Sequence, residues 1–317
     1  MQLYMAPLEG ITGYIFRNTY SEIYKGVDKY FTPFIVPAKK RDLRTREKKD
    51  ILPENNTNLN VVPQILTNKS DEFTSLAKRL KEYGYREINL NAGCPSGTVV
   101  AKDKGAGILR DRDELRRFLD EIFSCDINIS VKTRIGMSDR EEFYEIMDIY
   151  NEYPMTELII HPRVREDYYK NNVDMEAFSY GYEHGKMPVV YNGDIFNKQQ
   201  FENICKDYSG IKGIMMGRGI LKTPGITEWI KGETEAWSID FKRMKRFHDM
   251  LLSGYSEDMK SDINAMFKMK ELWTYMIGCF EVEEQESVEK IYKKIRKTRD
   301  YREYMSYVAQ LFDNYSG

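Results

Sequence analysis

The feature of this sequence that most restricts its fold is a repeated alternation of short apolar runs with longer amphipathic segments. Continuous apolar runs of about four to eight residues are typical of strands buried on both faces. Eight such runs occur, at residues 3–8, 30–36, 61–66, 87–92, 128–135, 157–162, 188–195 and 213–219. Apolar residues at helical spacing fill intervening segments, at residues 70–84, 111–124, 140–153 and 197–210. Ser70 is the expected cap of the first segment, which ends on Gly84 as helices often do. This alternation predicts a (β/α)8 TIM barrel rather than a doubly wound sheet.

The alternation stops near residue 230, and the rest of the chain has helical spacing throughout. Glycines and polar clusters separate three amphipathic stretches, at residues 241–255, 263–281 and 286–312. We therefore expect a catalytic barrel domain over 1–230 and a small C-terminal all-helical domain over 231–317.

Composition excludes several classes of protein. The chain has 48 basic and 50 acidic residues, so nucleic-acid binding would depend on local basic patches rather than on net charge. Four cysteines without a CxxC pair and only three histidines argue against a zinc site or a disulfide framework. The N-terminus does not have the pattern of a signal peptide, and no apolar stretch approaches the ~20 residues of a membrane span. We expect a soluble, cytoplasmic monomer that binds no metal.

Polar residues gather where the predicted strands end, which is where the active sites of such barrels lie. Core-facing strands normally avoid Lys, Arg and His, so this gathering is the main functional signal. The residues are Ala6, Pro7, Glu9, Gln64, Asn91, Cys94, Lys132, Arg134, His161, Arg163, Asn192, Gly193, Asp194, Gly217 and Arg218. The glycines of the last two strand ends, followed by a short helix in 221–230, are typical of a phosphate cradle. These residues alone predict a phosphate-bearing cofactor.

Several motifs, taken together and in order, resemble the tRNA-dihydrouridine synthase family. They are MAPLEGIT (5–12), NLNAGCPSGTV (89–99) with GAGIL (105–109), SVKTRIG (130–136), IIHPRVREDYY (159–169), VVYNGDI (189–195) and IMMGRGIL (214–221). The resemblance covers nearly all of 1–230, and the helical tail resembles that family's tRNA-binding domain. It implies an FMN enzyme that uses NADPH to reduce the C5=C6 bond of uridines in tRNA.

The resemblance also implies roles for individual residues. Cys94 would give a proton to C5 after hydride reaches C6, since an ordinary thiol is mostly protonated at neutral pH. FMN would be held by Ala6, Pro7, Gln64, Asn91, Lys132, His161, Asn192, Gly193, Asp194, Gly217 and Arg218. Lys102, Arg134 and Arg163 would contact the RNA. Two basic segments, 39–49 and 290–299, are candidate patches for binding its phosphate backbone.

Other interpretations stay open at this point. A flavin barrel could reduce a small molecule or act on another structured RNA, and an RNA-binding protein could keep the fold without turnover. Departures from the family pattern, at Pro33, Val100-Ala101 and Pro162, leave the target position undetermined. Cys125, Cys205 and Cys279 fall at apolar positions of predicted helices and are interpreted as core residues, and no functional role is assigned to His184 and His248.

Overall fold

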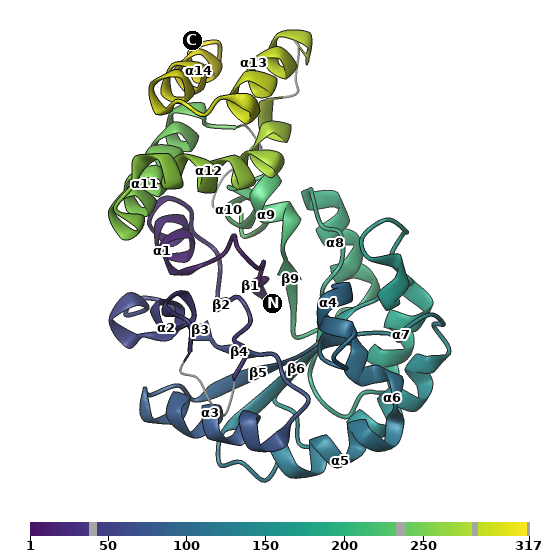
Figure 1. Ribbon diagram of the computed structural model, residues 1–317. Helices are drawn as coiled ribbons and strands as arrows, with labels where there is room; N and C mark the ends of the chain where they lie inside the picture. The colour runs from purple at the N-terminus through teal and green to yellow at the C-terminus, as the bar shows by residue number, and fades with distance from the viewer. Residues whose placement is uncertain (38–42, 233–238, 281–284, 316–317) are drawn as a thin grey trace. The chain divides into compact units, whose positions relative to one another are not determined.

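The computed structural model describes residues 1–37, 43–232, 239–280 and 285–315 (Figure 1). Within them, one sheet of nine parallel strands has the order β3-β2-β1-β9-β8-β7-β6-β5-β4. The strands are β1 (Gln2–Met5), β2 (Lys29–Phe31), β3 (Val61–Val62), β4 (Gln64–Ile65), β5 (Glu87–Ala92), β6 (Asn128–Arg134), β7 (Leu158–His161), β8 (Val189–Tyr191) and β9 (Gly213–Met216). All eight predicted apolar runs contain strands of this sheet.

Pro63 explains why eight runs give nine strands. It separates β3 from β4, and these two strands are the opposite edges of the sheet. Proline has no N–H to give to a ladder, but its carbonyl accepts a hydrogen bond from the N–H of Asn89 at 2.8 Å. Because one continuous segment supplies both edges, the sheet closes on itself. The predicted (β/α)8 barrel is confirmed.

Helices in the first compact unit surround this sheet (Figure 1). They include α2 (Thr45–Ile51), α3 (Ser70–Glu82), α4 (Gly97–Val100), α5 (Arg112–Ile122), α6 (Glu142–Tyr150) and α7 (Met175–His184), while α8 (Lys198–Asp207) precedes β9. The Asp111 carboxylate accepts N–H bonds at the start of α5, as an N-cap should. The predicted Ser70 cap is wrong, because Ser70 is already helical and Lys69 precedes it without a side-chain cap bond.

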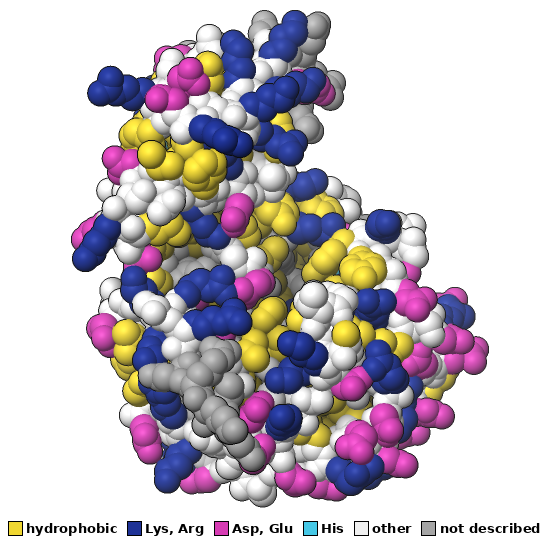
Figure 2. All heavy atoms as spheres, viewed as in Figure 1, with side chains coloured by type: hydrophobic (Ala, Val, Ile, Leu, Met, Phe, Trp, Pro, Cys, Tyr) yellow, Lys and Arg dark blue, Asp and Glu magenta, His cyan; other side chains and the backbone are white. Residues whose placement is uncertain are grey.

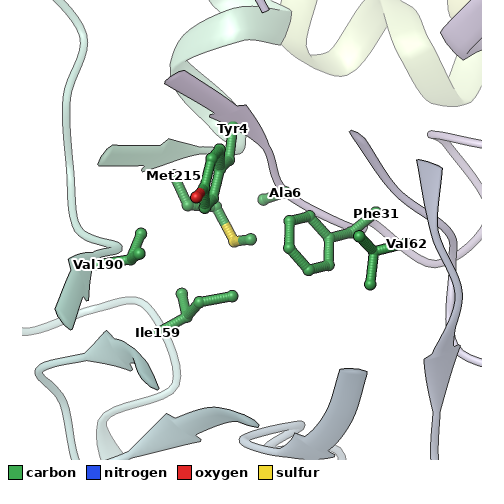
Figure 3. Packing of buried hydrophobic residues seen from close by; sticks show 7 residues of the cluster. All are labelled: Tyr4, Ala6, Phe31, Val62, Ile159, Val190 and Met215. Atoms are coloured by element: carbon green, nitrogen blue, oxygen red, sulfur yellow. The ribbon is translucent and has the colours of Figure 1, made fainter. Parts of the chain in front are cut away.

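The interior of the barrel follows the alternation of side chains along each strand. An apolar cluster fills the part enclosed by β1, β2, β3, β7, β8 and β9, where the side chains point toward one another (Figure 3). Its members are Tyr4, Ala6, Phe31, Val62, Ile159, Val190 and Met215. The corresponding positions of β4, β5 and β6 are polar instead, and these positions lead to the candidate site.

The second compact unit comprises residues 11–27, 195–201 and 217–317. Its helices are α1 (Tyr14–Ile23), α9 (Arg218–Lys222), α10 (Ile226–Ile230), α11 (Phe241–Met259), α12 (Asp262–Met276), α13 (Gln285–Lys297) and α14 (Tyr301–Asp313). His248 is fully buried there, and its Nε2 lies 2.7 Å from the hydroxyl of Tyr304. Helices therefore dominate the C-terminal region, as predicted. None of the described helices is long and apolar enough to cross a membrane.

Candidate active site

Cys94 lies in the loop after β5, and the end of that strand fixes its backbone. The side-chain oxygen of Asn91 accepts hydrogen bonds from the N–H groups of Gly93 at 3.1 Å and Cys94 at 2.9 Å. Pro95 follows, buried, and helix α4 begins at Gly97. Because one amide oxygen holds two successive backbone N–H groups, the loop backbone at Cys94 cannot move away from β5 without breaking these bonds.

Gly105 supports the same loop from the other side. Its φ of +58° lies in the left-handed region, and an added Cβ would lie 2.8 Å from both the Cβ and the carbonyl oxygen of Cys94. The next N–H, of Ala106, donates to that carbonyl at 3.0 Å. The motif GAGIL therefore positions the cysteine. From the sequence, no positioning role was predicted for Gly105. The two glycines of GAGIL, just after the cysteine segment, did indicate that another part of the backbone passes close by.

The surroundings of Cys94 keep its thiol protonated. Burial raises the pKa of Cys94 above its ordinary value, and the carboxylate of Glu9 acts in the same direction. The backbone N–H of Ser96 and the charges of Arg134 and Lys132 oppose this rise, because they favour a thiolate. The site therefore holds a proton on sulfur and also has groups that can stabilise the anion left after its release.

Lys132 is the inward-facing neighbour of Asn91 on β6. Part of its side chain is accessible, but it lies deep among protein atoms, and burial lowers its pKa to about 7, with the charge of Arg134 adding to the effect. Among the described residues, its ammonium has no hydrogen-bond acceptor or ion-pair partner. A buried amine without a partner is costly, so this position fits a ligand that supplies hydrogen-bond acceptors.

Arg134 is almost wholly buried at the end of β6. Its guanidinium donates to three backbone carbonyls, those of Gly93 (3.0 Å), Val164 (2.8 Å) and Tyr168 (2.6 Å). These bonds tie the cysteine loop to the loop after β7. A contact with an RNA phosphate would require some of these bonds to change, so the geometry supports a positioning role, and the phosphate contact stays a prediction.

Arg163 is equally buried and joins three groups at the ends of β7 and β8. It donates to the carbonyl of Asn171 at 2.7 Å, to Nε2 of His161 at 2.9 Å and to the carboxylate of Asp194 at 2.5 Å. Because Nε2 accepts this bond, the proton of a neutral His161 ring lies on Nδ1. As with Arg134, the predicted RNA contact is untested, and the observed bonds hold a histidine and an aspartate in place.

The structure brings other predicted residues to the same end of the barrel. Gln64 has no accessible surface and its amide bonds to Asn91 and Asn89, so a direct ligand contact would require a change of partners. Asn192 donates from its side chain to the carbonyl of Met215 at 2.8 Å. A Cβ at Gly193 would collide with the ring of Tyr191. Ala6 and Pro7 follow β1 directly.

Gly217 and Arg218 belong to the second unit, where Gly217 precedes α9 and the Arg218 guanidinium lies 5.8 Å from the ring centroid of Phe196. Their predicted phosphate contacts stay predictions. Lys102 is exposed in the first unit. Of the basic segment 39–49, residues 39–42 lie outside the described residues.

The basic segment 290–299 is described, and it is mainly in α13. Figure 2 shows several Lys and Arg side chains over the C-terminal helices. Four lysines of α13 are exposed, Lys290, Lys293, Lys294 and Lys297. On α11, basic and polar side chains make up most of the lining of a shallow hollow of about 480 Å³. The lining residues are Lys242, Lys245, Arg246, Asp249, Met250 and Ser253. This hollow was not predicted from the sequence.

Sequence reasoning also missed Tyr169 in the loop after β7. Its ring lies 5.8 Å from the ring of His161, and the guanidinium of Arg134 lies 5.3 Å from its centroid. Half of its surface is exposed. The paired tyrosines of IIHPRVREDYY were a signal, because aromatic side chains in a loop at the mouth of a barrel suit contact with a flat ligand.

The structural interpretation of the remaining cysteines was partly wrong. Cys279 is buried as predicted, but Cys125 and Cys205 are half-buried rather than core residues. Cys125 lies beyond the end of α5, and Cys205 lies on α8 near Met1. Among the described residues, no group of three or more potential ligands could hold a metal ion.

Comparison with known proteins gives a consistent result for the sequence. The family model described as dihydrouridine synthase matches residues 4–311. The tRNA-dihydrouridine(16) synthase of Shigella flexneri is 28% identical over 241 residues, which cover 73% of this chain and 76% of that protein. A probable tRNA-dihydrouridine synthase of Staphylococcus epidermidis is 27% identical over 293 residues, covering 89% and 87% respectively.

Solved structures share the fold at low sequence identity. Morphinone reductase in complex with tetrahydroNAD has a TM-score of 0.52 and 10% identity, covering 76% of this chain and 89% of that chain. Histamine dehydrogenase from Rhizobium sp. 4-9 has a TM-score of 0.55 and 14% identity, covering 73% and 46%. At these identities the likeness concerns the barrel alone.

Proposed function

The chain belongs to the dihydrouridine synthase family, and from this premise we propose that it is an NADPH-dependent tRNA-dihydrouridine synthase that reduces the C5=C6 bond of uridines in tRNA. Two relatives that match most of this chain are named tRNA-dihydrouridine(16) synthase and probable tRNA-dihydrouridine synthase. We further propose FMN as its bound cofactor and NADPH as the reductant. Reduced FMN, when bound, supplies the hydride for C6.

The donor set at the end of the barrel fits a flavin ring, which presents carbonyl oxygens and ring nitrogens. Lys132 offers an ammonium without a protein acceptor among the described residues. Asn91 lies at the end of β5 and His161 at the end of β7, on either side of β6, and each keeps a small accessible surface. In this proposal Gln64 accepts a hydrogen bond from Asn91 and so holds the Asn91 side chain in place. Ala6, Pro7, Asn192, Gly193 and Asp194 line the mouth, and Gly217 and Arg218 bind the phosphate.

Cys94 completes the reduction as general acid. The S–H bond breaks as a C–H bond forms at C5 of the uracil, and the electron pair stays on sulfur as a thiolate. The N–H of Ser96 and the charges of Arg134 and Lys132 favour that thiolate. A proton from water then restores the thiol. Because burial raises the pKa of Cys94, the acid is fully protonated before each turnover.

The target uridine must leave its stack to reach this loop. We propose that Lys102 and the lysines of α13 contact the RNA backbone, with residues 231–317 acting as the tRNA-binding domain. Arg134 and Arg163 contribute by holding the loops that receive the base. We also propose that the protein acts as a cytoplasmic monomer.

The observation that carries the proposal is a protonated cysteine whose loop is fixed by Asn91, the strand neighbour of Lys132, whose ammonium has no partner among the described residues. The test incubates tRNA from cells lacking dihydrouridine with purified protein, FMN and NADPH, followed by mass spectrometry of the nucleosides. Wild type is expected to form dihydrouridine, and the Cys94→Ala variant is expected to form almost none.

Cys125→Ala is the matched control, because Cys125 is a half-buried cysteine beyond the end of α5 whose thiol contacts Thr74 and not a predicted site residue. It is expected to keep wild-type activity. If the flavin is reduced and reoxidised but wild type forms no dihydrouridine, tRNA is the wrong substrate, and a small molecule or another RNA takes its place. Mapping the modified position in the tRNA then identifies the target uridine.

A further inference from the structure

A continuous series of hydrogen bonds runs through the polar side of the barrel to the Cys94 loop. Ser130 donates to the carboxylate of Glu87 at 2.8 Å, and Asn89 donates to Ser130 at 3.0 Å. Gln64 donates to the oxygen of Asn89 at 2.8 Å, and Asn91 donates to the oxygen of Gln64 at 2.7 Å. The oxygen of Asn91 then accepts the N–H groups that fix the loop. We call these five side chains, Glu87, Ser130, Asn89, Gln64 and Asn91, the interior amide chain.

Both ends of the interior amide chain require the same orientation of every amide. At the upper end, backbone N–H groups can only donate, so Asn91 must present its oxygen to them and its NH₂ to Gln64. At the lower end, Glu87 can only accept, so Ser130 gives away its single proton and must accept from Asn89. Gln64 lies between, and the two requirements agree there. Ser130 has a second acceptor, the carbonyl of Ile88 at 3.4 Å, which leaves its accepting role unchanged.

Burial makes this orientation hard to change. Gln64, Asn89 and Ser130 have no accessible surface, so a reversed amide would leave buried donors and acceptors unpaired. Glu87 is anchored by an ion pair with Lys29 at 2.9 Å. Burial disfavours the charged form of Lys29, but Glu87 and Glu157 outweigh it and raise the pKa of Lys29. The ion pair therefore holds the carboxylate of Glu87 in place at the lower end.

We propose that Asn89 and Ser130 are positioning residues for Cys94: through the interior amide chain they hold the Asn91 oxygen against the N–H groups of the cysteine loop. Neither residue has a surface from which to touch substrate or cofactor. The proposal rests on the proposed function for its catalytic consequence, but the position of the loop can be measured independently of activity.

The test measures alkylation of Cys94 by iodoacetamide in the purified full-length protein, resolved by peptide mass spectrometry over about pH 6 to pH 10. Asn89→Leu removes both bonds of Asn89. We expect Cys94 to react about five- to a hundredfold faster near neutral pH, the equivalent of one or two lost buried hydrogen bonds. We also expect the midpoint of its pH profile to move down toward that of an ordinary thiol. Cys125 and Cys205 of the same molecules provide internal reference rates.

Two further variants separate positioning from general destabilisation. Ser130→Ala removes the hydroxyl that accepts from Asn89 and donates to Glu87, but it leaves the bond from Gln64 to Asn89 in place, so it is expected to give a smaller acceleration in the same direction. Ile159→Ala opens a cavity in the apolar part of the same interior and is expected to lower the unfolding temperature without changing the Cys94 rate. With tRNA, Asn89→Leu should lower kcat for dihydrouridine and leave KM nearly unchanged.

An unchanged Cys94 alkylation rate and pH profile in folded Asn89→Leu and Ser130→Ala would overturn the proposal. So would an equal acceleration in Ile159→Ala. If Asn89→Leu does not fold, Ser130→Ala decides, because it removes a single hydroxyl. If wild type forms no dihydrouridine, the proposed function fails, while the alkylation rates still decide whether the interior amide chain positions the cysteine.

Discussion

The two sides of the barrel interior are built from different chemistry. On the side of β1, β2, β3, β7, β8 and β9, seven buried apolar side chains pack together (Figure 3). On the side of β4, β5 and β6, amides, a hydroxyl and an amine take the equivalent positions, and hydrogen bonds link most of them to the Cys94 loop. Apolar packing stabilises the fold but does not fix the orientation of individual atoms, because the hydrophobic effect is non-directional. Each hydrogen bond of a side-chain amide, in contrast, requires a donor to face an acceptor. Stability and positioning should therefore be separable by mutation.

The largest effect is expected at the residue that the polar side positions. Cys94→Ala should lower kcat for dihydrouridine formation by about 10²- to 10⁴-fold, the usual contribution of a general acid. Its unfolding temperature should stay close to that of wild type, because the Asn91 bonds reach the backbone and not the thiol. Stopped-flow reduction of the bound flavin by NADPH provides the control. A Cys94→Ala variant with full dihydrouridine yield would show that the proton comes from another group.

The apolar side should give the opposite result. Phe31→Ala removes a ring with no accessible surface from the apolar cluster, and a loss of about 3–5 kcal/mol in the free energy of unfolding is expected. The alkylation rate of Cys94 and kcat at low temperature should change little, since no bond of the interior amide chain involves Phe31. Urea denaturation measures the first effect. Phe31→Leu, which keeps most of the volume, should recover most of the stability.

The sequence predicted the frame of the site better than its internal contacts. The apolar runs located all the strands, because a strand buried on both faces is visible as continuous apolar residues; only the break at Pro63 was hidden. Arg134 and Arg163 show the limit. In a sequence, an arginine at a strand end suggests contact with an anion. Here the partners include groups about 30 residues away, the carbonyls of Val164 and Tyr168 for Arg134 and the carboxylate of Asp194 for Arg163. Which partners a buried charge finds depends on loop conformation, and apolar periodicity carries no information about it.

The interior amide chain was hidden for a similar reason. Gln64 and Asn91 were predicted as cofactor ligands from strand ends and family motifs, whereas Asn89 and Ser130 were not singled out. The register that brings Gln64 beside Asn89 and Asn89 beside Ser130 is a property of the closed sheet. Only when neighbouring strands are aligned do three separate polar residues become one connected series.

A smaller effect is expected when the cysteine loop is disturbed from outside the interior. Gly105→Ala places a methyl group against Cys94 at a backbone φ of +58°, so both contact and conformation are unfavourable. We expect a loss of about 1–3 kcal/mol in unfolding free energy, with a lower kcat and altered Cys94 alkylation. Gly84→Ala is the matched control: it also has positive φ, but nothing lies within 4 Å of its added Cβ. Equal kcat in both variants would indicate that Gly105 serves the backbone alone.

A pH dependence should distinguish Lys132, whose ammonium has no partner among the described residues, from exposed lysines. In the folded protein the pKa of Lys132 is lowered to about 7 from its ordinary 10.5. Between these values the unfolded chain binds a proton that the folded chain does not, so this residue makes the free energy of unfolding rise with pH, and its penalty is fully present below about pH 7. Lys132→Met lacks this penalty. It should exceed wild type in stability near pH 6, and its advantage should shrink toward pH 10. Lys102→Met, at an exposed position, should follow the wild-type slope. Urea denaturation without added FMN, repeated across this pH range, gives the slope of unfolding free energy against pH for the three proteins. Parallel slopes for wild type and Lys132→Met would contradict the prediction. They would mean that the Lys132 ammonium has a partner in solution and is not an unpaired charge that a ligand could bind.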